Sequence, residues 1–415
     1  MIKRSLFLFV VSIFINQLTF GQDQTFVFKD TSEEGSWLTL SGFNYYSSNR
    51  FNNDYMDKWI FGGEITQEIK DRSSERLSSR NSIGAEFENE ISFHTSAIHP
   101  FKLQNWGLTF GISDNHYISS NIPQDLFDVA MYGNAPYLGD TLNFNFGHFQ
   151  YQHFQKFGIG MYDRRNMSSI RLSYVSGSKT INGRLGNSWM LNEEDSIQLA
   201  LQGSSYRSEK FSPYMAFQGS GFAFDLDYNF IFENKKGSRQ IINFKVKNLG
   251  IIFWNQNSYQ NGIDSLTTYS GIDIRDFLNS DDSLSFENFS VLDTLGLKES
   301  QGAQTDFLSP ELVVQKLADQ ASPNKLQAIF GFKAILSSDY FPYFYAGGYF
   351  KATDNFSISS RVSYGGFGGL KVGLNANYWA GDKVYLGLGT YDLLGNISKT
   401  IGYGRGFNLT ARFKL

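Results

Sequence analysis

The sequence FNLTARFKL, residues 407–415, ends the chain and alternates apolar and polar side chains without a break. Every second residue is apolar: Phe407, Leu409, Ala411, Phe413 and Leu415. The residues between them are polar, and Arg412 and Lys414 are charged. Successive side chains of a β-strand point to opposite faces, so this strand has one oily and one polar face. A barrel in lipid needs this pattern, because its outside meets hydrocarbon and its lumen meets water.

Three stretches upstream repeat the alternation. They cover residues 356–364, 370–378 and 384–389, and short turns rich in Gly and Asp separate them, as in β-hairpins. The first two stretches are nine residues long, which is close to the length a tilted strand needs to cross a bilayer. These observations predict an all-β, transmembrane antiparallel barrel.

The start of the chain has the features of a secretory signal peptide, residues 1–21. Lys3 and Arg4 precede an apolar run, and Thr19 and Gly21 are small residues before a cut at Gln22. The apolar run is about half of the ~20 residues that a spanning helix requires. We therefore expect residues 22–415 to be exported and to form a single barrel in the outer membrane of a Gram-negative cell.

Composition agrees with this prediction. The 415 residues include 40 Gly, 40 Phe and 23 Tyr but no Cys, which excludes disulfides and thiol chemistry. The mean hydropathy is −0.29, and only helices and closed barrels satisfy their backbone in lipid, so a spanning chain this polar is expected to be a barrel. The net charge of −4 gives no indication of nucleic-acid binding.

Counting candidate strands gives 16, with 14 as the alternative. Besides the four strands from residue 355 to the end, they are 36–47, 57–65, 82–97, 105–116, 148–163, 168–176, 181–190, 195–206, 221–232, 239–254, 326–337 and 341–351. Two long inserts, about 117–147 and 255–325, interrupt them. Counted back from a periplasmic C-terminus, both inserts are expected on the periplasmic side. The outward loops are then the short ones at 163–167, 192–195, 233–237, 337–339, 365–368 and 393–401.

Both inserts carry helix signals. Pro123 precedes a helix-like run to Met131, and Ser309 and Pro310 form an N-cap and first turn before residues 311–318. The second segment would place Leu312, Val313 and Leu317 on one side of a helix. That helix is expected either to plug the barrel or to dock a partner, with closure of the rim as the simpler alternative. The acidic stretch 276–299 is interpreted as a solvated loop.

Candidate charged residues lie on the polar faces of the predicted strands. Asp225 and Asp227 are neighbours in the lumen, and paired carboxylates can do acid–base work or bind Ca²⁺. We favour the simpler interpretation that they contribute to a polar lumen. The expected counter-charges are Lys245, Lys247, Arg361 and Lys371.

No motif for catalysis, a metal or a cofactor emerges. His148 and His153 are five residues apart on one predicted strand, so they face opposite sides and cannot share a metal. The sequence contains neither HExxH nor GxSxG, and Ser176 to Lys179 matches SxxK without its partner motifs. The prediction is therefore no catalytic site, no metal and no cofactor.

Several motifs resemble an uncharacterised outer-membrane barrel family, a domain of unknown function. They are FAFDLDYNF at 222–230, FKVKNLGIIFW at 244–254 and PQDLFD at 123–128 with the aromatic run that follows to Gly160. That family is broadly similar to barrels of the FadL/PorV type, which serve hydrophobic transport and protein secretion. The resemblance implies a barrel fold and brings no catalytic residues.

The preferred functional hypothesis is a non-enzymatic transport barrel for a small or hydrophobic solute. One alternative is an accessory or scaffold barrel of a secretion or envelope assembly, and another, made unlikely by the missing Ser/His/Asp motifs, is an outer-membrane lipid hydrolase. The expected partners are outer-membrane lipid, the barrel assembly machinery and a periplasmic protein.

Overall fold

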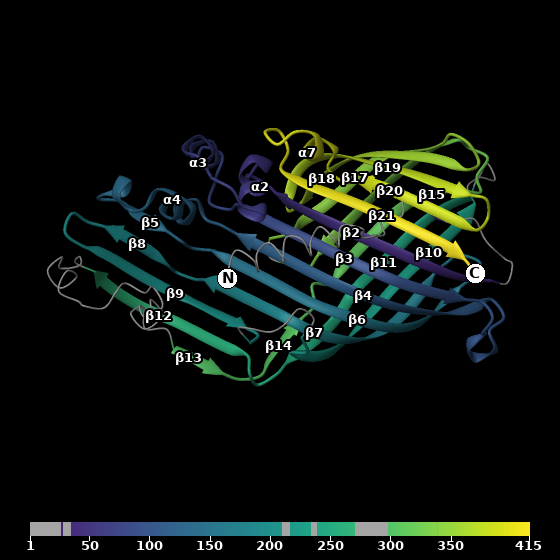
Figure 1. Cartoon of the computed structure of the whole chain (residues 1–415), viewed down its shortest axis with the longest axis horizontal. Coiled ribbons are helices and arrows are strands. Elements are labelled where there is room, and N and C mark those ends of the chain that lie inside the picture. Colours follow the sequence, from purple (N-terminus) through teal and green to yellow (C-terminus); the bar gives the residue numbers. More distant parts are fainter. Residues whose placement is uncertain (1–25, 28–34, 210–215, 234–238, 270–297, 338) are drawn as a thin grey trace.

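Fourteen strands, each paired with an antiparallel neighbour on both sides, form the closed wall of a barrel (Figure 1). The computed structural model describes residues 26–27, 35–209, 216–233, 239–269, 298–337 and 339–415. In order around the wall the strands are β2 (Ser36–Ser48), β3 (Ser82–Thr95), β4 (Trp106–Asn121), β6 (His148–Asp163), β7 (Ser169–Leu185), β10 (Gly219–Glu233), β11 (Arg239–Trp254), β15 (Glu311–Asp319), β16 (Leu326–Ile335), β17 (Phe341–Lys351), β18 (Phe356–Gly366), β19 (Gly368–Ala380), β20 (Val384–Thr390) and β21 (Gly404–Lys414). The last strand, β21, pairs with β2 and closes the barrel.

The two surfaces of the wall differ as the alternation predicts. On β21, Phe407 is 56% exposed and Asn408 is 5% exposed; on β6, Phe157 is 46% exposed and Lys156 is 3% exposed. Exposed apolar side chains continue around the outside as a band, for example Ile91, Ile112, Leu172, Phe222, Phe253, Phe330, Val362, Leu374 and Leu388. The fold is therefore the predicted transmembrane antiparallel barrel.

The two mouths of the barrel carry different connections. Ser36 and Lys414 lie at one end, which we call the terminal mouth, and the turns 96–105, 164–168, 352–355 and 381–383 are also there. The long connections 49–81 and 122–147, and the described parts of those after β7 and β11, lie at the opposite end, the loop mouth.

Beyond the loop mouth the sheet continues as an extension (Figure 1). The last residues of β7 pair with β9 (Ile197–Arg207), which also pairs with β8 (Trp189–Asn192) and β12 (Tyr259–Tyr269). The outermost strands are β5 (Thr141–Asn143) beside β8 and β13 (Lys298–Gln301) beside β12. Two short strands accompany the wall: β14 (Gln304–Phe307) on β11 and β1 (Phe26–Val27) parallel to β15.

Three helices cover the outside of the wall at the loop mouth: α2 (Asn53–Phe61), α3 (Gln67–Ser74) and α4 (Gln124–Tyr132). Phe51, Met56 and Phe127 pack with Ile83 and Ala85, two outward-facing residues of β3. The shorter helices are η1 (Pro100–Lys102), η2 (Ala135–Tyr137) and α7 (Leu393–Ile397). No helix among the described residues is long and apolar enough to cross a membrane.

The predicted count of 16 strands is wrong, and the alternative of 14 is confirmed. Residues 57–65 are not a strand: α2 starts after Asn52, whose side chain accepts from the Tyr55 N–H at 3.3 Å, and it ends at Gly62, which has φ +83°. Residues 169–176 and 181–185 belong to the single strand β7, residues 189–190 begin β8, and the stretch predicted at 195–206 is β9 of the extension. The short helices expected in the first insert are present, whereas the predicted signal peptide and residues 276–297 lie outside the described residues.

The predicted helix at 309–318 is also wrong, because residues Glu311–Asp319 are the wall strand β15. Both of its edges are occupied, by β11 and β16, and this pairing overrides the local Ser-Pro start signal. Because β15 was missed, the sides predicted for both inserts and for the turn at 163–167 are exchanged, whereas 192–195 lies in the extension at the loop-mouth end. The inserts therefore lie at the loop mouth, opposite Ser36 and Lys414, and not on the side of the C-terminus as expected.

The two mouths can be tested by labelling, because the chain has no native Cys. We expect Ser204→Cys, exposed on β9, to react with a membrane-impermeant maleimide in intact cells. We expect Asp354→Cys, in the turn after β17, to react only after the outer membrane is permeabilised. The reverse pattern would show that the barrel has the opposite orientation.

Candidate functional site

Three glutamates on β3 carry negative charge into the lumen: Glu86, Glu88 and Glu90. We call these residues, with the cations that they bind, the glutamate ladder. Glu86 Oε2 lies 2.8 Å from Lys333 Nζ on β16, and Glu88 Oε2 lies 2.6 Å from Lys247 Nζ on β11. Because β16 stands opposite β3 in the wall, the ladder joins opposite walls of the barrel.

The third glutamate of the ladder, Glu90, is bound by a cation that passes two glycine residues of the intervening strands. Arg171 Nη1 on β7 lies 2.6 Å from Glu90 Oε1, although β6 and β4 stand between the two strands. A Cβ at Gly158 of β6 would come within 2.4 Å of the Arg171 side chain, and one at Gly111 of β4 within 2.6 Å. The two glycines therefore clear the path along which the guanidinium crosses the lumen.

Asp225 and Asp227 face the lumen as predicted, each with its own cation. Asp227 Oδ2 lies 3.1 Å from Lys245 Nζ, and Asp225 Oδ2 lies 2.9 Å from Lys156 Nζ, a partner that the sequence analysis missed. Asn248 has φ +57° in a bulge of β11, and its backbone N–H donates to Asp225 at 2.8 Å. With their charges paired, the two carboxylates support the simpler interpretation of a polar lumen.

The other three predicted counter-charges have different neighbours. Lys247 binds Glu88 of the ladder. Arg361 and Lys371 are buried near the loop mouth among aromatic rings: Arg361 lies 4.0 Å from the centre of the Tyr391 ring, and Lys371 lies 5.3 Å from that of Tyr45.

Apolar side chains fill the lumen between the ladder and the loop mouth. One group is Tyr117, Ile335, Tyr340, Tyr343, Tyr345 and Phe367. A second group is Phe154, Val175, Ala223, Ile252, Trp254 and Leu308. The lumen is thus packed with rings towards the loop mouth and crossed by ion pairs below them.

Between the ladder and the terminal mouth lies a cavity of about 100 Å³. Its lining is mostly charged or polar: Glu90, Lys156, Arg171, Asp225, Asp227, Lys245 and Lys247 line its inner part, with His94 and Tyr162 towards the mouth. A cavity this large holds several water molecules.

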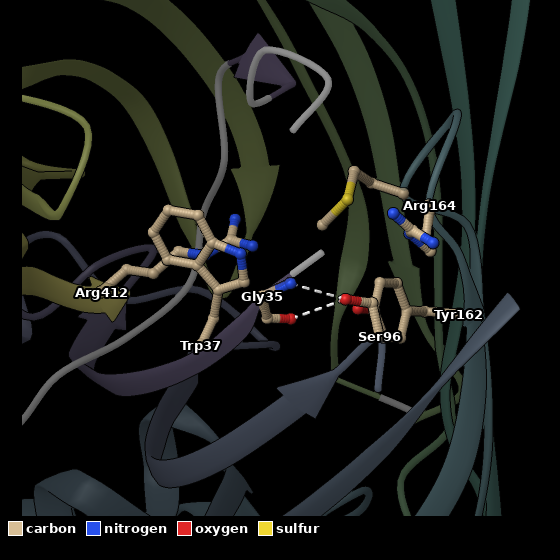
Figure 2. Close-up of a pocket in the computed structure, with 7 residues that line it drawn as sticks. Gly35, Trp37, Ser96, Tyr162, Arg164 and Arg412 are labelled. Atoms are coloured by element: carbon tan, nitrogen blue, oxygen red, sulfur yellow. Dashed lines mark hydrogen bonds between the residues drawn. The ribbon is translucent and has the colours of Figure 1, made fainter. Parts of the chain in front are cut away.

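At the terminal mouth Arg412 and Trp37 line a small pocket (Figure 2), and Arg412 also lines this cavity. The Arg412 guanidinium lies 4.4 Å from the centre of the Trp37 ring. Figure 2 also shows Ser96 joined to Gly35, whose N–H donates to the Ser96 Oγ at 2.7 Å. A guanidinium and an aromatic ring therefore lie side by side at the terminal mouth.

The three residues predicted for a plug or docking helix belong instead to β15. Val313 and Leu317 are buried on its lumen face, and Leu312 lies on the outward face with Val314. The helix hypothesis therefore has no structural basis, because an alternating strand cannot place all three side chains on one side.

His148 and His153 face opposite sides of β6, as predicted. His148 Nδ1 lies 2.6 Å from Asp339, and the Ser119 hydroxyl donates to the same Asp339 oxygen at 2.8 Å. The carboxylate thus stands between the hydroxyl and the imidazole, whereas a catalytic triad needs the imidazole in the middle. His153 faces outward and meets His116 and Asp114, a combination that the sequence analysis did not consider.

Residues 36–388 match the model of a protein family described as "Family of unknown function (DUF5723)", so the chain belongs to that family. This confirms the predicted resemblance to an uncharacterised barrel family. No curated protein matches the sequence.

Among solved structures, the chain is similar to the Pseudomonas putida toluene transporter TodX, with a TM-score of 0.37, 7% identity and coverage of 92% of this chain and 89% of the other. It is similar to a Pseudomonas aeruginosa FadL homologue, with a TM-score of 0.39, 10% identity and coverage of 91% and 90%. A third is the translocator domain of the Neisseria meningitidis autotransporter NalP, with a TM-score of 0.29, 7% identity and coverage of 93% and 90%.

Proposed function

We propose that this member of a family of unknown function is a non-enzymatic outer-membrane barrel that transports a small polar solute and is gated by the glutamate ladder. The observation that carries the proposal is the cavity of about 100 Å³ that meets the terminal mouth and ends at ion pairs crossing the lumen. Ligand sites usually measure about 300–1,000 Å³. The cavity as it stands is therefore the vestibule of a closed state.

The charges explain why such a gate would hold and still open. Glu88 and Lys247 are partly buried, at 23% and 21% side-chain exposure, so water from the vestibule reaches their pair. Removing one partner of a buried pair costs several kcal/mol, because it leaves an uncompensated charge, whereas replacing both partners together is often neutral. A polar solute that offers its own hydrogen bonds would replace the contacts between one glutamate of the ladder and its cation.

Removing one complete ion pair of the glutamate ladder tests the proposed gate. We expect Glu88→Ser combined with Lys247→Ser to raise single-channel conductance in planar bilayers severalfold, because the cross-lumen tie and its bulk are both lost. The double change leaves the net charge unchanged and no unpaired charge behind. The matched control is Ile91→Ala, which changes an exposed, outward-facing residue of the same strand.

Two measurements separate the possible results. Liposome swelling with small sugars and amino acids reports passage of uncharged and zwitterionic solutes. Equal conductance of the wild type and the double variant would contradict gating by the ladder. A double variant that conducts no ions and passes no solute would contradict transport itself.

The extension favours one second candidate, an accessory barrel that binds a partner. The sheet of β9, β8 and β12 projects past the loop mouth (Figure 1), which gives a partner a surface that transport does not need. The partner would then bind on the loop-mouth side and not at the terminal mouth, where the described connections are short. A cross-linker attached at Ser204→Cys in intact cells would capture it, and the same cross-linker at Asp354→Cys is the control.

A further inference from the structure

A cluster of two histidines and an aspartate lies on the outward face of the wall. His116 of β4 and His153 of β6 are direct partners in the sheet, and Asp114 is two residues before His116. One step towards the terminal mouth, the outward pair is Ile112 and Phe157, which are 54% and 46% exposed and belong to the apolar band. On the other side, Ile118 packs against the hydrophobic core beneath helices α2 to α4 that contains Phe51 and Phe127. The cluster therefore occupies the boundary between the lipid band and the helical cover.

The three side chains converge on one point. His153 Nε2 lies 2.8 Å from Asp114 Oδ1, and His116 Nε2 lies 3.2 Å from Asp114 Oδ2. The two imidazole rings are stacked, with centres 3.9 Å apart and planes 10° apart. One ligand atom from each residue falls within 4.8 Å of the others. This spacing lets the three groups reach a single ion once one of the stacked rings turns its Nε2 lone pair towards it.

Gln155 adds further polar contacts to this arrangement. Gln155 Nε2 lies 2.6 Å from Asp114 Oδ1 and also 2.9 Å from His153 Nε2. Ser178 donates to Gln155 Oε1 at 2.8 Å, which fixes the amide with its N–H₂ towards the cluster. If His153 Nε2 donates to Asp114, it and the Gln155 amide both donate to the same carboxylate oxygen. A cation bound to the carboxylate and both imidazole Nε2 atoms would take the place of these donors.

The surroundings suit metal ligation. Tyr151 holds the other ring nitrogen of His116, with its hydroxyl 3.0 Å from Nδ1. Such an outer contact fixes the orientation of a ligating imidazole. The side chains of His116 and Asp114 are 18% and 20% exposed, so an ion can enter from solvent.

We propose that Asp114, His116 and His153 form a site for a divalent transition-metal ion of the Zn²⁺ class. Two imidazoles and one carboxylate are the ligands such ions accept in protein sites that keep one position open. The ion would tie β4 to β6 just outside the apolar band. Because it binds the folded wall and not the unfolded chain, it would also stabilise the barrel.

The test uses the full-length mature barrel without a polyhistidine tag, refolded in detergent and stripped of metal. We expect one Co²⁺ per chain, seen by visible d–d absorption, and displacement of Co²⁺ by Zn²⁺. His153→Ala and Asp114→Asn should abolish this signal, and Asp114→Asn keeps a hydrogen-bond acceptor so that the wall still forms. Tyr151→Phe should weaken binding by about 10–100-fold, as removal of an outer contact does.

Two further variants sharpen the test. His99→Ala is the matched control, because His99 lies in a turn at the terminal mouth, and it should bind as the wild type does. Gln155→Glu places a second carboxylate at the same point and should tighten Zn²⁺ binding. The proposal is overturned if the wild type takes up no stoichiometric Co²⁺ or Zn²⁺, or if a folded His116→Ala/His153→Ala double variant binds as well as the wild type. Heat modifiability on gels verifies folding of each variant.

Discussion

Deleting Arg412–Leu415 is expected to abolish assembly of the barrel in the membrane. These residues pair with β2 on one side, Arg412 with Thr39 and Lys414 with Trp37, and with β20 on the other. Without them the start of β2 and the start of β20 lose their partners where the wall closes. An unpaired backbone group in lipid costs several kcal/mol, so the open edge cannot be tolerated. The measurement is the amount of heat-modifiable protein in the outer-membrane fraction.

A control chain has the full strand length and the same alternation of apolar and polar side chains, but four substitutions: Arg412→Gln, Phe413→Leu, Lys414→Thr and Leu415→Phe. It should assemble, because strand length and lipid-facing pattern are retained. Normal levels of embedded protein from the deleted chain would contradict the argument from closure. Failure of the control chain would show that the particular side chains, such as Arg412 against Trp37, are what assembly requires.

The barrel was predictable because lipid enforces alternation on each wall strand. The pattern at 356–364, 370–378 and 407–415 identifies β18, β19 and β21 within a few residues. Where the wall extends beyond the lipid, that constraint disappears. Asp114 and His116 thus sit at outward positions of β4 that further down hold Phe110 and Ile112. Helices and the extension occupy this region, and here the strand assignments were wrong.

One strand was misread for a different reason. Residues 309–318 carry the Ser-Pro start of a helix, while Val313, Gln315 and Leu317 face the lumen and Leu312, Val314 and Lys316 face outward. This alternation is weak because polar and apolar residues occur on both faces. The pairing with β11, which is distant in the sequence, and with the following strand β16 decides it.

For the lumen, the sequence predicted which side chains face inward but not which of them meet. Asp225, Lys245 and Lys247 are inward by alternation, yet Lys247 binds Glu88 on a distant wall strand. Such partners depend on which strands face each other across the barrel. The alternate spacing of Glu86, Glu88 and Glu90 was a usable signal, since three carboxylates on one face require cations nearby. His116 and His153 were missed because their contact is a register between strands.

Leu374→Arg is expected to destabilise the folded barrel by about 2–4 kcal/mol, the cost of a cation on the lipid face near the middle of the bilayer. Leu374 is at the centre of β19 and 38% exposed on the outward face. Its neighbours along that face, Leu370 and Tyr378, are exposed too. The measurement is the free energy of unfolding from urea titrations of the barrel refolded into lipid vesicles.

The control is a residue on the same outward face at a different depth in the membrane, and not a residue on the lumen face. Asn375, the lumen-facing neighbour, is a poor control because it is 5% exposed and accepts a hydrogen bond from Asn408 at 3.1 Å. Arginine there would clash, whatever the lipid does. Leu370 has the same outward direction and lies near the loop-mouth end of β19, so Leu370→Arg should cost only about 0–1 kcal/mol. Equal costs at the two positions would contradict the placement of Leu374 at the middle of the bilayer.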